Sequence, residues 1–329
     1  MKATAKAHSN IALVKYWGKR NEHLMLPQNS SISMTLDKFY TITTVKFSER
    51  LKEDELWLNK KKQEGKELEG IEKPLNKVRE LAGIKLKAKV MSENNFPTAA
   101  GLASSASGFA AMALAASKAA GLNLDKKELS ILSRIGSGSA SRSILGGFVE
   151  WKKGEKSNGL DSFAVQVADE NHWPEFRMIT TIVSSKKKKI KSRAGMTQTV
   201  KNCPYYRAWL DTIEEDLNAV GRGIKNKKFS LVGRTAELNS LKMHATMMTT
   251  TPSIIYWQPL TMKVIHLIQD LRERGIECYF TMDAGPNVKV MTLKNNEKKV
   301  LKELNKIKGI KTVSCKAGPA AKIINKHLF

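Results

Sequence analysis

The feature that most constrains this chain is a run of small residues at positions 97–107 that leads into an alanine-rich segment. Residues 108–120 are almost wholly apolar, which predicts a buried helix closed by Gly121. Small side chains let another molecule approach the backbone, and the first turn of a helix offers unpaired N–H groups and a positive dipole end. The run therefore predicts an anion site, most often one for phosphate. A tight turn before a buried helix is the alternative, and no Walker Lys-Ser or Lys-Thr follows the glycine.

Length and charge limit the class of protein. A chain of 329 residues is expected to form two lobes, and no apolar run approaches the roughly 20 residues that span a bilayer. No secretory signal is visible, so we expect a cytoplasmic location. The 56 Lys+Arg against 31 Asp+Glu give a net charge of +25. Such a charge could favour the binding of nucleic acid, an anionic membrane or anionic substrates. The lysines are scattered and no nucleic-acid motif accompanies them. The sequence therefore predicts a lysine-coated surface with no nucleic-acid or membrane partner.

Hydrophobic periodicity predicts helices and antiparallel strands that do not alternate as βαβ units, which indicates an α+β fold. Helices are predicted at residues 75–82, 108–120, 125–135, 205–220, 229–243, 261–274 and 298–307. Strands are predicted at residues 5–14, 31–36, 40–47, 56–59, 86–91, 147–151, 177–183, 278–282, 288–293 and 311–315. A second glycine/serine loop covers residues 136–142, and residues 186–193 are basic and loop-like. We expect lobes at residues 1–183 and 184–329.

The cysteines Cys203, Cys278 and Cys315 lack metal-ligand spacing and cannot all pair with one another. Reduced thiols are the expectation for a cytosolic protein. A Cys203–Cys278 disulfide is the alternative if the source is hyperthermophilic.

Seven segments in order along the chain carry a family resemblance. They are residues 10–20, 26–36, 94–107, 136–143, 146–151, 172–175 and 283–287. Lys-Tyr-Trp-Gly-Lys at 15–19 and Asp-Ala-Gly-Pro-Asn at 283–287 are the most specific of them. The chain resembles the diphosphomevalonate decarboxylases of the GHMP kinase superfamily. The resemblance implies a two-lobed GHMP-kinase fold, with an N-terminal ribosomal-protein-like lobe and a C-terminal ferredoxin-like lobe around a cleft.

The resemblance also implies a reaction. Members of this family use ATP, with Mg2+, to phosphorylate the 3-hydroxyl of (R)-5-diphosphomevalonate. Loss of the 3-phosphate and of CO2 then gives isopentenyl diphosphate, in the mevalonate route of isoprenoid biosynthesis. A homodimer is expected from the family alone.

Three residues are the candidates for catalysis. Asp283 ends a strand before Ala-Gly-Pro, a turn that projects its carboxylate; turn formation alone is the alternative. A carboxylate there can orient the 3-hydroxyl and accept its proton. By resemblance Lys15 pairs with Asp283 and assists the chemical step. Arg142 can grip the substrate carboxylate through two N–H groups.

The resemblance places further residues around the substrates. Substrate-binding candidates are Asn10, Tyr16, Trp17, Gly18, Lys19, Lys73, Ser137, Gly138, Ser139, Ala140, Ser141, Arg142, Ser192 and Arg193. ATP-binding candidates are Pro97, Ala99, Ala100, Gly101, Leu102, Ala103, Ser104 and Ser105. The two serines that end this run are also the candidate Mg2+ ligands, with phosphates supplying the other oxygens. Trp17 is expected to pack rather than react. Arg193 departs from the threonine that many relatives carry, and the match at Lys73 is loose.

Three functions remain open at this point. The first is the full decarboxylation of the diphosphate substrate, which Lys19 and Ser192 favour. The second is a relative that decarboxylates 5-phosphomevalonate or only phosphorylates mevalonate at the 3-position. Kinase-only relatives lack the Asp/Lys pair, whereas Asp283 and Lys15 are both present here. The third is a basic nucleic-acid-binding protein that keeps the fold without the activity.

Overall fold

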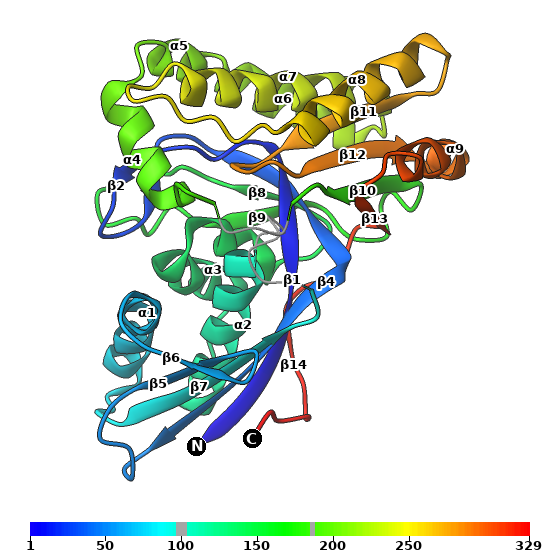
Figure 1. Cartoon of the computed structure of the whole chain (residues 1–329). Helices are drawn as coiled ribbons and strands as arrows, with labels where there is room; N and C mark the ends of the chain where they lie inside the picture. The colour runs from blue at the N-terminus through cyan, green and yellow to red at the C-terminus, as the bar shows by residue number, and fades with distance from the viewer. Residues whose placement is uncertain (97–103, 185–187) are drawn as a thin grey trace.

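Two β-sheets, one in each lobe, organise the computed structural model, which describes residues 1–96, 104–184 and 188–329 (Figure 1). The first sheet has eight strands in the order β14-β1-β4-β7-β5-β6, with β8 and β9 added beside β4. Its strands are β1 (Lys2–Val14), β4 (Ser31–Ser48), β5 (Glu55–Leu58), β6 (Lys61–Gln63), β7 (Lys87–Asn94), β8 (Phe148–Trp151), β9 (Ala164–Ala168) and β14 (Lys322–Ile323). The short strands β2 (Lys19–Asn21) and β3 (Leu26–Pro27) pair with each other.

Three helices lie beside this sheet: α1 (Lys66–Ala82), α2 (Ser104–Ala119) and α3 (Lys126–Gly136). Helix α2 packs against β1 and β4, and its many alanines allow that close approach. Helix α3 begins with the expected capping box, in which Asp125 Oδ1 accepts from the Glu128 amide at 2.8 Å and Glu128 Oε2 accepts from the Asp125 amide at 2.8 Å. Such a cap stabilises a helix by about 1 kcal/mol.

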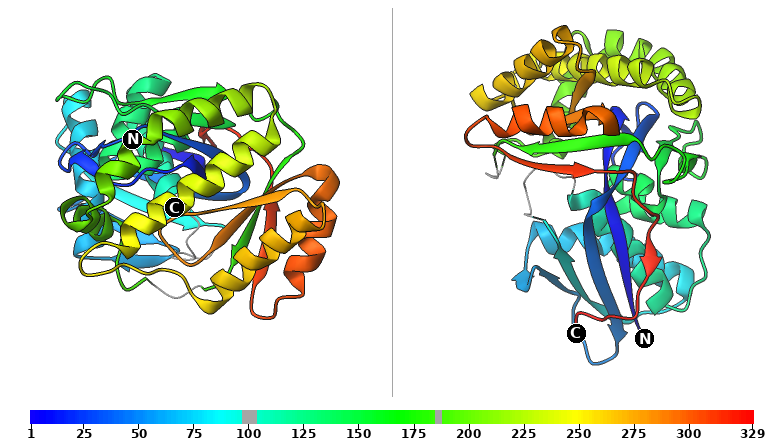
Figure 2. Two further views of the ribbon diagram at one scale, coloured as in Figure 1. Left: turned by 90° about the horizontal axis from the view of Figure 1, so that it is seen from above. Right: turned by 90° about the vertical axis from the view of Figure 1, so that its right-hand side faces the viewer.

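The second sheet is antiparallel, with four strands in the order β11-β12-β10-β13. These strands are β10 (Phe176–Ile182), β11 (Cys278–Met282), β12 (Val288–Leu293) and β13 (Lys311–Cys315). The helices of this lobe are α4 (Ser192–Asn202), α5 (Tyr206–Asp211), α6 (Ile213–Lys225), α7 (Phe229–Met248), α8 (Pro259–Glu273) and α9 (Lys294–Asn305). The views in Figure 2 show α6, α7 and α8 above the strands.

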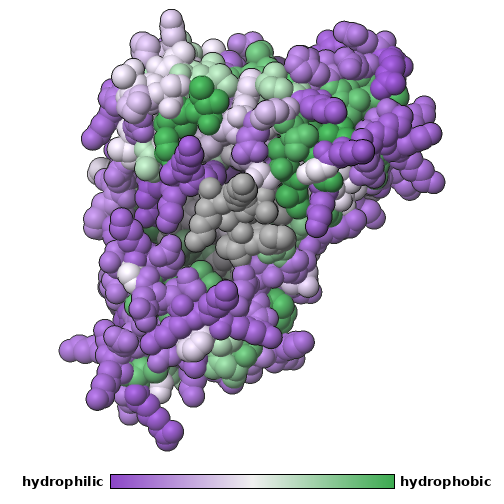
Figure 3. Space-filling view, in the orientation of Figure 1, coloured by the Kyte–Doolittle hydropathy of each residue, from purple (hydrophilic) through white to green (hydrophobic). Residues whose placement is uncertain are grey.

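One buried cluster joins the lobes. It combines Ile11 of the first sheet and Trp17, which follows β1, with Met243 of α7 and Tyr279 of β11. Because burial of apolar area is the main favourable term in folding, the two lobes stabilise one another across this junction. The surface is different: Figure 3 shows hydrophilic residues over most of the visible face, as the lysine content predicts.

The structure corrects several predicted elements. The strands predicted at 31–36 and 40–47 are one continuous strand, β4, and the helix predicted at 75–82 begins at Lys66. The glycine/serine loop at 136–142 is largely a 3-10 helix, η1 (Gly138–Ile144). The end of the segment predicted as loop at 186–193 is the first turn of α4. These errors share a cause: small and polar residues carry little periodicity, so tertiary contacts decide their conformation.

The lobe ranges 1–183 and 184–329 stay a prediction, and the strand pairing favours a different division. β10 pairs with β12 and β13, so this strand belongs with the second sheet although it precedes residue 183. β14 returns to the first sheet and pairs with β1. The alternative of a Cys203–Cys278 disulfide is wrong in this structure, because Cys203, Cys278 and Cys315 are all free. Cys278 is buried among the side chains of the second sheet and its helices.

Candidate active site

Asp283 lies where β11 enters the tight turn to β12, and the turn is held from several sides. Thr261 Oγ1 donates to the Pro286 carbonyl at 2.7 Å, and Asn287 Oδ1 accepts from the Val183 amide at 2.7 Å. His244 Nε2 lies 3.2 Å from the Asp283 carbonyl. The side chain of Asp283 keeps 32% of its surface exposed. The backbone is thus fixed while the carboxylate stays accessible.

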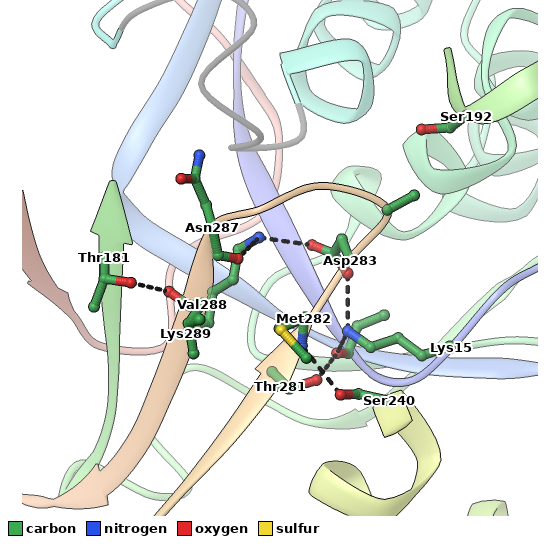
Figure 4. A network of polar contacts seen from close by, with 12 residues as sticks. Lys15, Thr181, Ser192, Ser240, Thr281, Met282, Asp283, Asn287, Val288 and Lys289 are labelled. Carbon is green, nitrogen blue, oxygen red and sulfur yellow. Dashed lines mark hydrogen bonds and ion pairs between the residues drawn. The ribbon is translucent and has the colours of Figure 1, made fainter. Parts of the chain in front are cut away.

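Lys15 and Lys289 contact different oxygens of the Asp283 carboxylate (Figure 4). Lys15 follows β1 and is 1% exposed, and its Nζ donates to Asp283 Oδ1 at 2.9 Å and to the Ala12 carbonyl at 2.8 Å. Lys289, on β12, places its Nζ 3.4 Å from Asp283 Oδ2. The expected Lys15–Asp283 pair is therefore present, with a second lysine that the sequence analysis did not identify.

Burial and charge shift the pKa values of this group in opposite directions. Burial alone would raise the pKa of the Asp283 carboxyl, but Lys15 and Lys289 hold that pKa well below its usual range. Burial lowers the pKa of Lys15 to about 8, although Asp283 partly opposes the shift. Asp283 is therefore an anion at neutral pH, and Lys15 is a cation close to its titration point.

Arg142, in η1, is buried and 2% exposed. Its Nε donates to Ser33 Oγ at 2.9 Å and to Asn10 Oδ1 at 3.3 Å, and its Nη1 donates to Ser31 Oγ. Burial lowers the pKa of Arg142 to about 10, with Asp283 opposing the shift. No carboxylate of the described residues forms a salt bridge with Arg142. A buried guanidinium held only by neutral groups is suited to bind an anionic ligand.

The predicted serine candidates meet where α2 begins and η1 begins. Ser137 Oγ lies 3.5 Å from Ser105 Oγ and 3.3 Å from Ser139 Oγ, and Asn10 Nδ2 donates to the Ser139 carbonyl at 3.0 Å. Ser104 begins α2. In the same η1 region, the remaining candidates are buried: Gly138, Ala140 and Ser141. The ATP-loop candidates Pro97, Ala99, Ala100, Gly101, Leu102 and Ala103 lie outside the described residues.

The segment from Tyr16 to Lys19 turns at Gly18, whose φ is +104°. Tyr206 of α5 donates its hydroxyl to the Trp17 carbonyl at 2.7 Å, and Trp17 is 1% exposed. Trp17 thus packs in the core, as predicted. The Tyr16 hydroxyl is buried without a hydrogen-bond partner in the described structure. Lys19 is half-buried, and burial lowers its pKa.

Ser192 and Arg193 form the first turn of α4. Arg193 Nη2 donates to the Gly136 carbonyl at 3.3 Å, so its guanidinium lies beside the start of η1. Lys188 donates to Ser192 Oγ at 2.9 Å and to the Ala284 carbonyl at 2.6 Å, which ties α4 to the Asp283 turn. Lys73 is exposed on α1, and its side chain forms no hydrogen bond or salt bridge with these residues within the described part of the chain.

Two lysines of the site were missed from the sequence for different reasons. Lys188 stands in a run of four lysines, where nothing separates a site residue from a surface residue. Lys289 could have been found, because Thr281 pairs with Lys289 across the β11–β12 hairpin. This pairing places Lys289, which follows Asp283 by six positions in the sequence, close to Asp283 in space.

The protein oxygens in this site are enough to hold Mg2+ only where nucleotide phosphates supply further ligands. No group of three or more His, Cys, Asp or Glu side chains that could hold a metal occurs among residues 1–96, 104–184 and 188–329. The hydroxyls of Ser104 and Ser105, at the start of α2, are hard ligands of the kind that Mg2+ prefers. Mg2+ tolerates this arrangement because it retains waters and takes phosphate oxygens.

Two family models together span nearly the whole chain. Residues 7–164 match the diphosphomevalonate decarboxylase-like N-terminal domain, and residues 178–324 match the mevalonate 5-diphosphate decarboxylase C-terminal domain. The chain belongs to the diphosphomevalonate decarboxylase family. Within the family, the Debaryomyces hansenii diphosphomevalonate decarboxylase is 39% identical, covering 91% of this chain and 81% of the relative. The human enzyme is 40% identical, covering 88% of this chain and 76% of the relative.

Solved structures of the family share the whole fold. Mevalonate diphosphate decarboxylase from Staphylococcus aureus is 44% identical with a TM-score of 0.93, covering 98% of both chains. MDDEF, solved in complex with MVAPP, AMPPCP and magnesium, is 45% identical with a TM-score of 0.93, covering 99% of both chains. The two-lobed α+β architecture predicted from the resemblance is therefore confirmed. None of the helices described here is long and apolar enough to cross a membrane.

Proposed function

We propose that this protein converts (R)-5-diphosphomevalonate and ATP into isopentenyl diphosphate, ADP, phosphate and CO2. The observation that carries the proposal is the pairing of Asp283 with Lys15 at 2.9 Å, beside the buried Arg142. Family membership supports it, as does the related MDDEF complex with MVAPP, AMPPCP and magnesium. The alternatives of a kinase-only or monophosphate-specific enzyme are not favoured.

Phosphorylation of the 3-hydroxyl is the first step. Asp283 accepts a hydrogen bond from the hydroxyl and directs its oxygen at the terminal phosphate of ATP. The pKa of Asp283 is held low, so it is a weak base. A loose phosphoryl-transfer transition state needs the nucleophile oriented more than deprotonated, so the proton can pass to the carboxylate late. The Lys15 ammonium stabilises negative charge on the reacting oxygen.

Decarboxylation is the second step. The carbon–carbon bond to the carboxylate breaks, its electron pair forms the new double bond, and the 3-phosphate leaves with the electrons of its C–O bond. Arg142 holds the substrate carboxylate in the required orientation through its free N–H groups. The tertiary phosphate, unlike a tertiary hydroxide, is a competent leaving group, which explains why ATP is consumed.

The phosphates are held by the basic and hydroxyl-bearing groups around this centre. Lys19, Arg193 and Ser192 lie on the side of α4 and take the diphosphate of the substrate. Ser104 and Ser105 would contact the ATP phosphates and hold Mg2+, which would reduce the negative charge of the phosphates. A homodimeric assembly and a cytoplasmic location complete the proposal, and both rest on family membership and the sequence.

The test supplies ATP, Mg2+ and 5-diphosphomevalonate, and follows ADP and CO2 in separate assays. We expect one CO2 for each ADP. ADP without CO2 would identify a kinase, and a preference for 5-phosphomevalonate would identify the monophosphate enzyme. A salt-sensitive RNA complex with neither product would support the nucleic-acid alternative.

A further inference from the structure

Lys289 faces the second oxygen of the catalytic carboxylate and is almost completely buried. It is 1% exposed, its Nζ lies 3.4 Å from Asp283 Oδ2, and it also donates to the Asn287 carbonyl at 3.1 Å. The Nζ of Lys15 lies 2.9 Å from the other oxygen, Asp283 Oδ1. Figure 4 shows the two ammonium groups approaching the carboxylate from different elements, β12 and the end of β1. Each carboxylate oxygen therefore has its own cation.

One lysine already balances the charge of Asp283, so the second is not explained by neutralisation. Burying a further ammonium group costs several kcal/mol unless its partners compensate. The β11–β12 hairpin nevertheless directs Lys289 at the carboxylate. In this hairpin Lys289 pairs with Thr281, two residues before Asp283. The arrangement gives Asp283 a counter-ion that is independent of Lys15.

We propose that Lys289 is a positioning residue that holds Asp283 in place when Lys15 turns toward the oxygen being phosphorylated. The inference rests on the proposed function, since it assigns Lys15 a second partner during the reaction. Lys15 can leave Oδ1 without releasing the carboxylate, because the Lys289 contact to Oδ2 persists. The carboxylate then keeps its orientation, and it stays an anion until it takes the proton of the 3-hydroxyl.

The groups that face Asp283 come from every element around it. Lys15 follows β1, Lys289 lies on β12, Arg142 on η1, and Lys188 just before α4. His244 of α7 approaches its carbonyl. Burial and the nearby Lys15 lower the pKa of His244 to about 3, so this ring is neutral at pH 7. Loss of one of the cations should raise the pKa of Asp283, because the remaining cation alone would then oppose the effect of burial.

The experiment compares Lys289→Met, which removes the charge and the hydrogen-bond donors of the ammonium group, with Lys289→Arg, which keeps a charged donor. Lys311→Met is the matched control, because Lys311 is exposed on β13 of the same sheet. In Lys289→Met we expect kcat to fall at least tenfold while KM for ATP and for 5-diphosphomevalonate stays within threefold. The 13Cγ resonance of Asp283, assigned with Asp283→Asn, should titrate at least one pH unit higher than in the unsubstituted enzyme. Lys289→Arg should recover most of this shift, and Lys311→Met should show none.

A Lys289→Met enzyme with unchanged kcat, or an Asp283 titration that does not move, would overturn the inference. If the methionine variant does not fold, Lys289→Gln carries both measurements, because its amide can still donate to the Asn287 carbonyl. Failure of the proposed function is a separate result: the unsubstituted enzyme would then release no CO2. The NMR titration is independent of turnover and tests the Lys289–Asp283 contact in either case.

Discussion

The Tyr206 hydroxyl donates to the Trp17 carbonyl at 2.7 Å, so helix α5 of the second lobe fixes the turn that carries Lys19. Gly18 forms that turn at φ +104°, and a Cβ added to it would lie 1.9 Å from the Tyr206 hydroxyl oxygen. The diphosphate-binding candidate Lys19 is thereby positioned by a contact between the lobes. Glycine at position 18 serves both the backbone conformation and the close approach of Tyr206.

Gly18→Ala should lower the free energy of unfolding by at least about 2 kcal/mol, because left-handed strain and overpacking add at this position. Gly221→Ala on α6 is the control, since nothing lies within 4 Å of its added Cβ. It should be neutral or stabilising by up to about 1 kcal/mol. Urea unfolding measures both changes. Equal stability of the two variants would contradict the structural role given to Gly18.

Asp283→Asn should fold and bind ATP but lose both ADP and CO2 formation, by at least about a thousandfold. The amide cannot accept the proton of the 3-hydroxyl and no longer attracts Lys15. Separate assays of both products, with far-UV circular dichroism to confirm folding, check this result. Substantial turnover by the variant would remove Asp283 from the mechanism.

Arg142→Gln should raise KM for 5-diphosphomevalonate at least about tenfold, because a charge-assisted contact to the substrate carboxylate is lost. KM for ATP should stay within threefold. Steady-state kinetics with each substrate varied in turn measures the two values. An equal rise in both would show a general disturbance of the site instead of a contact with the carboxylate.

Activity should depend on pH through Lys15, whose pKa is lowered to about 8 by burial. Below that value Lys15 is a cation, and as the pH rises through it the ammonium loses its proton and its pairing with Asp283. The profile of kcat/KM should therefore fall above about pH 8, since this parameter reports groups of the free enzyme. A profile that stays flat to pH 10 would be inconsistent with a protonated Lys15 in catalysis.

Thiol titration should give the same count with and without reductant, because all three cysteines are free. Burial raises the pKa of Cys278 and of Cys315 to about 12, so only the partly exposed Cys203 should react quickly with a thiol reagent in the folded state. Cys278 and Cys315 should react after unfolding. Two additional thiols appearing only with reductant would indicate a disulfide.

The sequence was most informative where local chemistry fixes conformation. The capping box at Asp125 predicted the start of α3, and the turn motif at residues 283–287 predicted both flanking strands. Prediction failed for η1 and α4, whose serine, glycine and lysine residues are shaped by contacts with distant segments. The lobe boundary at residue 183 stays a prediction; it separates β10 from pairing partners that follow it by about a hundred residues.

The candidate site, too, could be predicted only in part from the sequence. Motifs identified Asp283, Lys15 and Arg142, but the distances among them depend on the packing of two sheets against each other. Lys188 and Lys289 carried no motif and became visible only through their contacts with the Asp283 turn.

The central claim is that phosphorylation converts the 3-oxygen of the substrate into a leaving group. It is tested by 5-diphosphomevalonate labelled with 18O at the 3-hydroxyl, turned over with unlabelled ATP. The account predicts that the label appears in inorganic phosphate, in a ratio of one labelled phosphate to each CO2. Label in water, or CO2 release with unlabelled phosphate, would contradict it.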